Sequence, residues 1–147
     1  MERVNYFFYG TLMDPAIASR VSGMAVTAAR LRTATLEGYR RVRVADQHYP
    51  ALTPAPGVAV EGRLLRNVPE EVQRRIAAYE EKAYELKWEW VRGPGGLKTR
   101  ALVFVAGPAM KLSDEAWDFG DWCRRHRRPF LMSLDRWTKD FVRTPQQ

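Results

Sequence analysis

The stretch "NYFFYGTLMDP", Asn5–Pro15, decides how the fold begins. Aromatic and β-branched residues occupy every position of Val4–Tyr9 except Asn5 and predict a buried β-strand. Gly10 follows at once, and glycine tolerates backbone angles that other residues avoid. Pro15 suits the first position of a short helix over Ala16–Val21. We therefore expect the chain to leave a buried strand, bend sharply at Gly10 and enter a helix.

The bend itself is a candidate binding site. Successive N–H groups of Tyr9, Gly10, Thr11 and Leu12 can form a concave nest that attracts an anion such as a carboxylate. A plain strand followed by a turn explains the same residues, and the residues alone favour this simpler interpretation. Both interpretations stay open at this point.

Alternating charged and apolar residues indicate further strands. A loop is expected over Tyr49–Gly57 because three prolines interrupt it. Gly62 lies inside a predicted strand and indicates a bulge or a close approach of other backbone. The predicted strands are "RRVRVA" (Arg40–Ala45), "VAVEGRLL" (Val58–Leu65), and a hairpin of "LKWEWV" (Leu86–Val91) with "LKTRALVFVAG" (Leu97–Gly107).

Helices are expected in the middle and at the end of the chain. A central helix is predicted over Asn67–Glu80, with Asn67 as its cap and Glu70 completing a capping box. Two helices are predicted near the C-terminus, the first capped by Ser113. The second is predicted from an apolar stripe at helical spacing, formed by Phe130, Leu134, Trp137 and Phe141. Elsewhere in the chain, four aromatic residues are expected in the core: Tyr49, Tyr84, Trp88 and Trp90.

These elements predict an α+β fold with a small mixed β-barrel and flanking helices. A single domain over residues 1–147 is expected, with 111–147 as a C-terminal helical extension. The alternation of strand and helix that builds a doubly wound sheet is absent from the sequence pattern.

Glu80 is the candidate acid–base residue. On a helical wheel of about 100° per residue, Val72, Ile76 and Tyr79 define a buried stripe. Glu80 falls at roughly 80° from Val72, at the margin of the stripe, whereas Glu81 falls at about 180°, toward solvent. Partial burial disfavours a carboxylate and raises its pKa toward the range useful for proton transfer. A solvated glutamate at a helix end is the simpler alternative.

Composition excludes several classes of function. A single cysteine, Cys123, rules out an internal disulfide and fits a reducing cytoplasm, and with two histidines it gives no pattern for a zinc site. No apolar run approaches the roughly 18 residues of a membrane-spanning helix. The net charge of +7 invites a nucleic-acid interpretation centred on residues 124–128 of "CRRHRRP", but a solvated helix end explains that cluster at least as well. Nucleic-acid binding is therefore not favoured.

Two separated stretches together resemble the γ-glutamylcyclotransferase-like family. "YFFYGTLM" is similar to its N-terminal strand-and-loop signature, and "AAYEEKAY" to its aromatic-Glu pair followed by a tyrosine. "LEGYRR", "YPALTP" and "VEGRLL" lie between them in the family's order, so the resemblance covers about Val4–Val105.

The resemblance implies a nearly closed barrel with a pocket at one end. It also implies cleavage of a small γ-glutamyl compound by attack of the substrate's own α-amine, releasing 5-oxoproline, with no metal or cofactor. Backbone groups of Tyr9, Gly10, Thr11 and Leu12 would hold the γ-glutamyl group. Glu80 would take the proton from the α-ammonium and return it to the leaving nitrogen.

The sequence departs from the family pattern at the expected rim of the pocket. Glu81 stands where the family usually has glycine or another small residue, and Glu85-Leu86-Lys87 follow Tyr84 where an arginine is common. These changes put the identity of the substrate in question. A non-catalytic domain that binds a small ligand in the same fold is the alternative.

Overall fold

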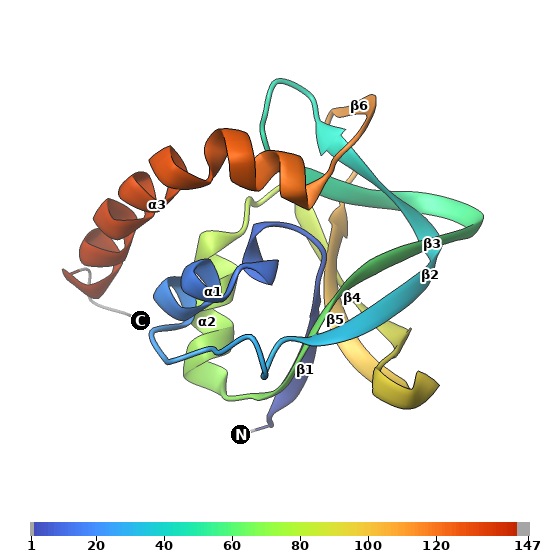
Figure 1. Cartoon of the computed structure of the whole chain (residues 1–147), viewed down its shortest axis with the longest axis horizontal. Coiled ribbons are helices and arrows are strands. Elements are labelled where there is room, and N and C mark those ends of the chain that lie inside the picture. The colour runs from blue at the N-terminus through green and yellow to red at the C-terminus, as the bar shows by residue number, and fades with distance from the viewer. Residues whose placement is uncertain (1, 144–147) are drawn as a thin grey trace.

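The computed structural model describes the backbone of residues 2–143 and the side chains of residues 2–139. Its strands are β1 (Val4–Phe8), β2 (Arg32–Val44), β3 (Pro50–Val68), β4 (Tyr84–Arg92), β5 (Lys98–Ala106) and β6 (Leu112–Ala116). Five of them follow the order β3-β1-β5-β4-β2, and β2 pairs with β3 to close a barrel (Figure 1). β1 and β5 are parallel and the other pairs are antiparallel, so the predicted mixed barrel is confirmed. β6 joins the outside of the ring by pairing with β2.

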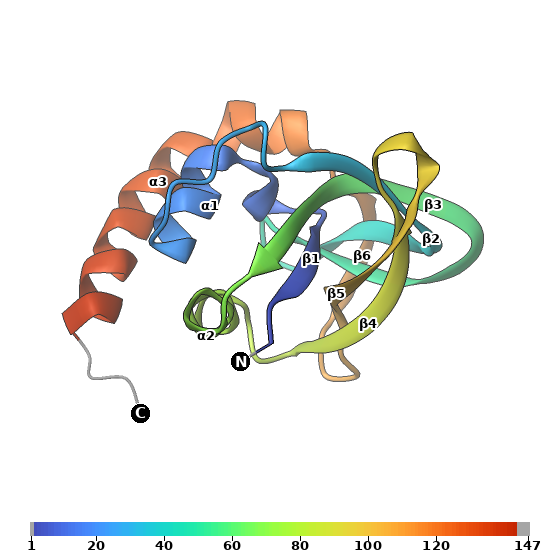
Figure 2. The ribbon, with the colours of Figure 1, turned by 90° about the horizontal axis from the view of Figure 1, so that it is seen from below.

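The helices α1 (Pro15–Ser22), α2 (Glu70–Tyr79) and α3 (Phe119–Arg143) lie to one side of the barrel (Figures 1 and 2). α1 begins as predicted, because the carboxylate of Asp14 accepts hydrogen bonds from the amides of Ala16 and Ile17. Single 3₁₀ turns, η1 (Thr11–Met13) and η2 (Pro94–Gly96), follow β1 and β4.

Alternation along the strands produces two separate cores. One face of each of the five barrel strands fills the barrel interior, where Phe7, Leu36 and Leu64 are almost fully buried. The opposite face of β1 and its neighbours packs against the helices, where Tyr6 and Phe8 meet residues of all three. β1 is therefore buried on both faces, which explains why all of its residues except Asn5 are apolar or aromatic.

The proline-rich segment expected as a loop is part of β3. It pairs with β2 from Pro50 to Pro54, and the register then shifts beside Gly38 and Gly57, both of which have positive φ. β1 pairs with β3 only from Arg63 onward, so these prolines lie where the strand has one pairing neighbour. Proline cannot donate to a ladder, but a strand with a single neighbour tolerates it.

Gly62 confirms the predicted close approach of backbone. A Cβ atom at this position would lie 2.3 Å from the carbonyl oxygen of Phe8 and 2.7 Å from the Phe7 ring. Any side chain would therefore push β1 and β3 apart directly below the bend at Gly10.

The predicted cap of the central helix is wrong. Asn67 adopts a positive φ and its N–H donates to the side chain of Asn5, so it does not cap a helix. The carbonyl oxygen of Pro69 instead accepts from Val72 and Gln73 at the start of α2. The local pattern identified the helix but displaced its start, because tertiary contacts with β1 fix the preceding residues.

The C-terminal segment contains one strand and one helix where two helices were predicted. Ser113 lies in β6, and its hydroxyl donates a hydrogen bond to the Arg43 carbonyl. β6 pairs with β2 through Val42 and Ala116. α3 continues through Pro129. Its predicted stripe packs on the helix-facing core at Phe130, Leu134 and Trp137, and the side chain of Phe141 lies outside the described residues.

Two aromatic residues expected in the core are on the surface. Trp88 and Trp90 are 44% and 62% exposed on the outer face of β4. They alternate with β4 residues that face the barrel side, such as the fully buried Val91. The helices that cover the outer faces of the neighbouring strands do not extend over this part of β4 (Figure 2).

Candidate active site

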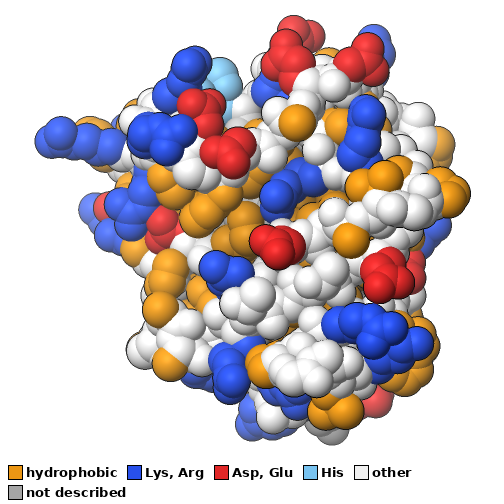
Figure 3. All heavy atoms as spheres, turned by 45° about the vertical axis from the view of Figure 1, so that its right-hand side comes forward, with side chains coloured by type: hydrophobic (Ala, Val, Ile, Leu, Met, Phe, Trp, Pro, Cys, Tyr) orange, Lys and Arg blue, Asp and Glu red, His pale blue; other side chains and the backbone are white. Residues whose placement is uncertain are grey.

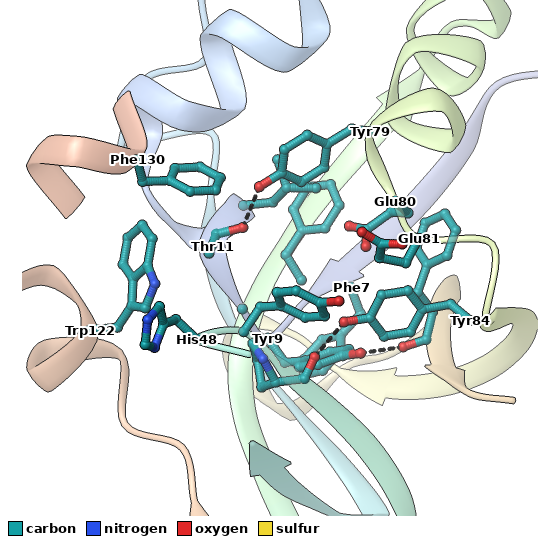
Figure 4. Close-up of a pocket in the computed structure, with 16 residues that line it drawn as sticks. Phe7, Tyr9, Thr11, His48, Tyr79, Glu80, Glu81, Tyr84, Trp122 and Phe130 are labelled. Atoms are coloured by element: carbon teal, nitrogen blue, oxygen red, sulfur yellow. Dashed lines mark hydrogen bonds between the residues drawn. The ribbon is translucent and has the colours of Figure 1, made fainter. Parts of the chain in front are cut away.

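A cavity of about 180 Å³ lies between the barrel end and the helices (Figure 4). Tyr9, Gly10, Thr11 and Leu12 line it from the end of β1, and Glu80 lines it from the end of α2. The structure thus brings together all five residues named from the sequence, although the bend and Glu80 are about seventy positions apart. Their roles toward a ligand remain predictions.

The structure gives a different reason for glycine at position 10 than the one predicted. Gly10 has φ −124° and so avoids the left-handed region that favours glycine. A Cβ atom there would stand 3.1 Å from the ring of Pro50, so close packing against β3 disfavours a side chain. The chain then enters η1, where Met13 and Asp14 donate to the carbonyls of Gly10 and Thr11.

The amides at the start of η1 are available to a ligand. Within the described part of the chain, the N–H groups of Thr11 and Leu12 have no hydrogen-bond acceptor. This follows from their position, because the first N–H groups of any helical turn lack an internal partner. Leu12 lines the cavity as well, and its side chain belongs to the helix-facing core.

Hydrogen bonds from distant elements fix the bend. Arg41 on β2 donates to the Tyr9 carbonyl at 2.9 Å, and the Tyr9 hydroxyl donates to the Phe104 carbonyl on β5. The hydroxyls of Thr11 and Tyr79 lie 2.7 Å apart in a hydrogen bond (Figure 4). This last bond links the bend directly to the last residue of α2, next to Glu80.

Glu80 reaches the cavity, but the helical wheel does not explain why. α2 ends at Tyr79, and Glu80 has extended angles (φ −76°, ψ 146°) while its N–H still donates to the Ile76 carbonyl. The change of direction at the helix end turns the side chain toward the aromatic lining. Burial, and then the charge of Glu81, raise the pKa of Glu80 to about 8. Among the described residues its carboxyl group has no hydrogen-bond or ion-pair partner.

The expectation that Glu81 faces solvent away from the cavity is wrong. Glu81 is an exposed residue, yet it lines the same cavity beside Glu80 (Figure 4). The wheel placed it opposite the buried stripe, but Glu81 follows the end of α2 and no longer obeys the helical period.

Tyrosines surround the Glu80 carboxyl group. Burial raises the pKa of Tyr9, Tyr79 and Tyr84 well above the ordinary value, so all three stay neutral throughout the pH range in which Glu80 titrates. The Tyr84 hydroxyl donates to the Pro50 carbonyl. Besides Glu81, the cavity residues that sequence reasoning did not assign to a site are Phe7, Phe8, His48, Tyr49, Pro50, Tyr79, Tyr84, Phe104, Trp122 and Phe130.

Residues 6–124 match the family model described as "Gamma-glutamyl cyclotransferase, AIG2-like". The chain belongs to this family. Two Arabidopsis thaliana proteins of the family, AIG2-like protein A and AIG2-like protein B, are each 27% identical to it. The first alignment covers 90% of this chain and 79% of the relative, and the second covers 86% and 73%.

Solved structures share the fold of this AIG2-like cyclotransferase family member. A solution structure of an Arabidopsis thaliana protein has a TM-score of 0.67 at 21% identity and covers 97% of this chain and 86% of its own. A chain described as "Gamma-glutamyl cyclotransferase" has a TM-score of 0.56 at 10% identity and covers 99% and 90%. The shared architecture is a mixed five-strand barrel with three helices.

The basic segment of this family member lies within α3, not at a helix end. Arg127 forms an ion pair with the buried Asp14, and Arg124 and Arg125 pair with Asp121. On the face in Figure 3, basic and acidic side chains are interspersed. Across the described residues, no group of three potential metal ligands forms a metal site, and no helix is long and apolar enough to span a membrane.

Proposed function

We propose that the protein is a cyclotransferase that converts a small γ-glutamyl compound to 5-oxoproline and a free amine or amino acid. Membership of the γ-glutamyl cyclotransferase family supports the reaction class. The observation that carries the proposal is the shared cavity of Glu80 and the Tyr9–Leu12 bend. A carboxyl group with raised proton affinity thereby faces free backbone donors across a space of ligand size.

The reaction needs a proton carrier but no enzyme nucleophile. Glu80, as a carboxylate, takes a proton from the substrate's α-ammonium, and the freed amine attacks the γ-carbonyl carbon. A carbon–nitrogen bond forms within the five-membered ring, the bond to the leaving nitrogen breaks, and Glu80 returns the proton to that nitrogen. The attacking nitrogen loses its second proton as it becomes the lactam N–H, and that proton passes to the released amine, which leaves as an ammonium ion. A carboxyl pKa of about 8 lies close to that of an α-amine, which is also about 8, so transfer in both directions is nearly balanced.

The bend would hold the negative end of the substrate. The N–H groups of Thr11 and Leu12 can donate to the α-carboxylate of the γ-glutamyl group. Because Arg41 and Tyr79 fix the bend from two sides, the anchor is rigid. A rigid anchor favours the folded substrate in which the amine faces the carbonyl.

The test is turnover by the purified protein. A panel of γ-glutamyl amines and γ-glutamyl dipeptides is incubated with the wild type, and 5-oxoproline is quantified by mass spectrometry. Glu80→Gln should lower kcat by about 100-fold or more, the size typical of a lost acid–base group. Glu85→Gln, at an exposed position outside the cavity, is the matched control. Ligand binding with no product from any substrate would support the non-catalytic alternative, and activity unchanged in Glu80→Gln would remove Glu80 from the mechanism.

A further inference from the structure

The cavity is acidic although the protein is basic. The chain has 24 lysine and arginine residues and a net charge of +7. Nevertheless, the charged residues that line the cavity are Glu80 and Glu81, and its described lining includes no lysine or arginine. A cavity lined by glutamates, with no lysine or arginine among its described lining residues, suits a ligand with positive groups.

Glu81 and two tyrosines form one corner of this cavity, here called the Glu81 corner (Glu81, Tyr49 and Tyr84). The rings of Tyr49 and Tyr84 lie 6.5 Å apart with a 49° angle between their planes. Burial, and then the charges of Glu81 and Glu80, raise the pKa of Tyr49, which agrees with their proximity. No ion pair engages Glu81 among the described residues. A carboxylate beside aromatic faces is a combination that attracts an ammonium group.

The exposure of the lining residues indicates which part of a substrate meets this corner. Thr11 is buried, Glu80 is partly buried and Glu81 is exposed. The exposed lining residues are Glu81 and His48, so the cavity meets solvent beside Glu81 as well as beside His48. If the γ-glutamyl group lies between the bend and Glu80, the leaving group extends from the γ-carbonyl toward the opening beside Glu81 and passes the Glu81 corner.

We propose that Glu81 is a specificity-determining residue that selects γ-glutamyl conjugates of diamines, whose leaving group carries a second, cationic nitrogen. The inference rests on the proposed cyclotransferase function. The free ammonium lies between the Glu81 carboxylate and the tyrosine rings, while Glu80 serves the α-amine. A leaving group that carries a carboxylate meets the like charge of Glu81 and is disfavoured.

The experiment uses three conjugates of similar length that differ in terminal charge. They are the γ-glutamyl conjugates of 1,4-diaminobutane (cationic), pentylamine (neutral) and 4-aminobutyrate (anionic). In the wild type, kcat/KM should fall in this order by about fivefold at each step, as expected for a partly exposed ion pair. The cationic preference should shrink as salt rises from low to about 0.5 M, because salt screens exposed charges.

Glu81→Gln should bring the cationic-to-neutral ratio of kcat/KM close to one, and Glu81→Lys should favour the anionic conjugate. Using the ratio cancels any effect that the lost charge has on proton transfer by Glu80. Glu85→Gln is the matched control and should keep the wild-type ratio. Equal kcat/KM for all three conjugates in the wild type, or an unchanged ratio in Glu81→Gln, would overturn this inference alone. Absence of turnover with every conjugate would instead overturn the proposed function on which it rests.

Discussion

Replacing Glu80 with glutamine should stabilise the protein, and the gain should grow with pH. Burial raises the pKa of Glu80 from 4.5 to about 8. Below pH 4.5 the carboxyl is protonated in both the folded and the unfolded chain and carries no ionisation penalty. Between pH 4.5 and 8 the unfolded chain loses this proton while the folded chain keeps it, so the free energy of unfolding falls as pH rises. Glutamine does not titrate and removes this loss.

The size of the gain follows from the pKa shift. The rise from 4.5 to about 8 corresponds, at about 1.4 kcal/mol per pH unit, to an upper limit of about 5 kcal/mol. The cavity opens to water beside Glu81, and water stabilises part of the ionised form. We therefore expect about 2–3 kcal/mol at pH 9, or a rise in Tm of roughly 6–9 °C for a chain of this size.

Urea unfolding of wild type and Glu80→Gln at pH 4, 6, 7.5 and 9 measures this difference directly. The two proteins should agree within about 0.5 kcal/mol at pH 4 and diverge steadily above pH 5. Glu85→Gln supplies the matched control, because Glu85 is exposed and its substitution should give a small difference that is independent of pH. A Glu80→Gln difference that stays constant from pH 4 to 9, or that favours the wild type at high pH, would refute the assignment of a buried carboxyl with raised proton affinity.

Three further predictions concern the frame around the cavity. Gly62→Ala should lower the free energy of unfolding by about 2 kcal/mol or more in urea unfolding, because its Cβ would overlap backbone 2.3 Å away; a neutral result would contradict the close approach. Asp14→Asn should cost about 2 kcal/mol at pH 7, because asparagine can still cap α1 but lacks the negative charge that pairs with Arg127. Burial acts to raise the pKa of Asp14, but the hydrogen bonds and the charge of Arg127 outweigh it and lower the pKa, so the cost should shrink as acidification protonates Asp14 in the folded protein. Thr11→Val and Tyr79→Phe should each destabilise the fold, and a double-mutant cycle should show coupling of about 1 kcal/mol; additive effects would mean that the hydrogen bond contributes nothing.

Local signals in the sequence predicted the parts of the molecule whose cause is local. The buried strand before Gly10, the start of α1 at Pro15 and the hairpin of β4 and β5 depend on residue types within a few positions. The close approach at Gly62 was also predicted, because a glycine inside a strand often marks a place where another backbone segment comes near. Pairing across long separations was not predictable in this way. Ser113 has the local features of a helix cap, but its segment is a strand because it pairs with β2, which lies about seventy residues earlier in the chain.

The candidate site shows the same division. The bend at Gly10 and Glu80 were identified through local sequence signals and the family resemblance. The wall formed by His48, Trp122 and Phe130 was not, because neither a turn residue nor an apolar residue of a helix shows from local sequence that it borders a cavity. Glu80 was placed correctly for the wrong reason, since α2 ends one residue before it.

The absence of a partner for the Glu80 carboxyl connects stability to function. Thr11, Tyr9 and Tyr84 each direct their hydroxyl to a tyrosine or a backbone carbonyl, so none of these hydrogen bonds engages Glu80. A fold optimised only for stability would pair or replace a carboxyl in such surroundings. The stability that Glu80→Gln gains at high pH is therefore a measure of the proton affinity that the site holds for its ligand. Binding of a γ-glutamyl compound should reduce that gain, because its α-ammonium supplies the missing partner; a gain unaffected by saturating substrate analogue would separate Glu80 from the ligand and confine it to a structural role.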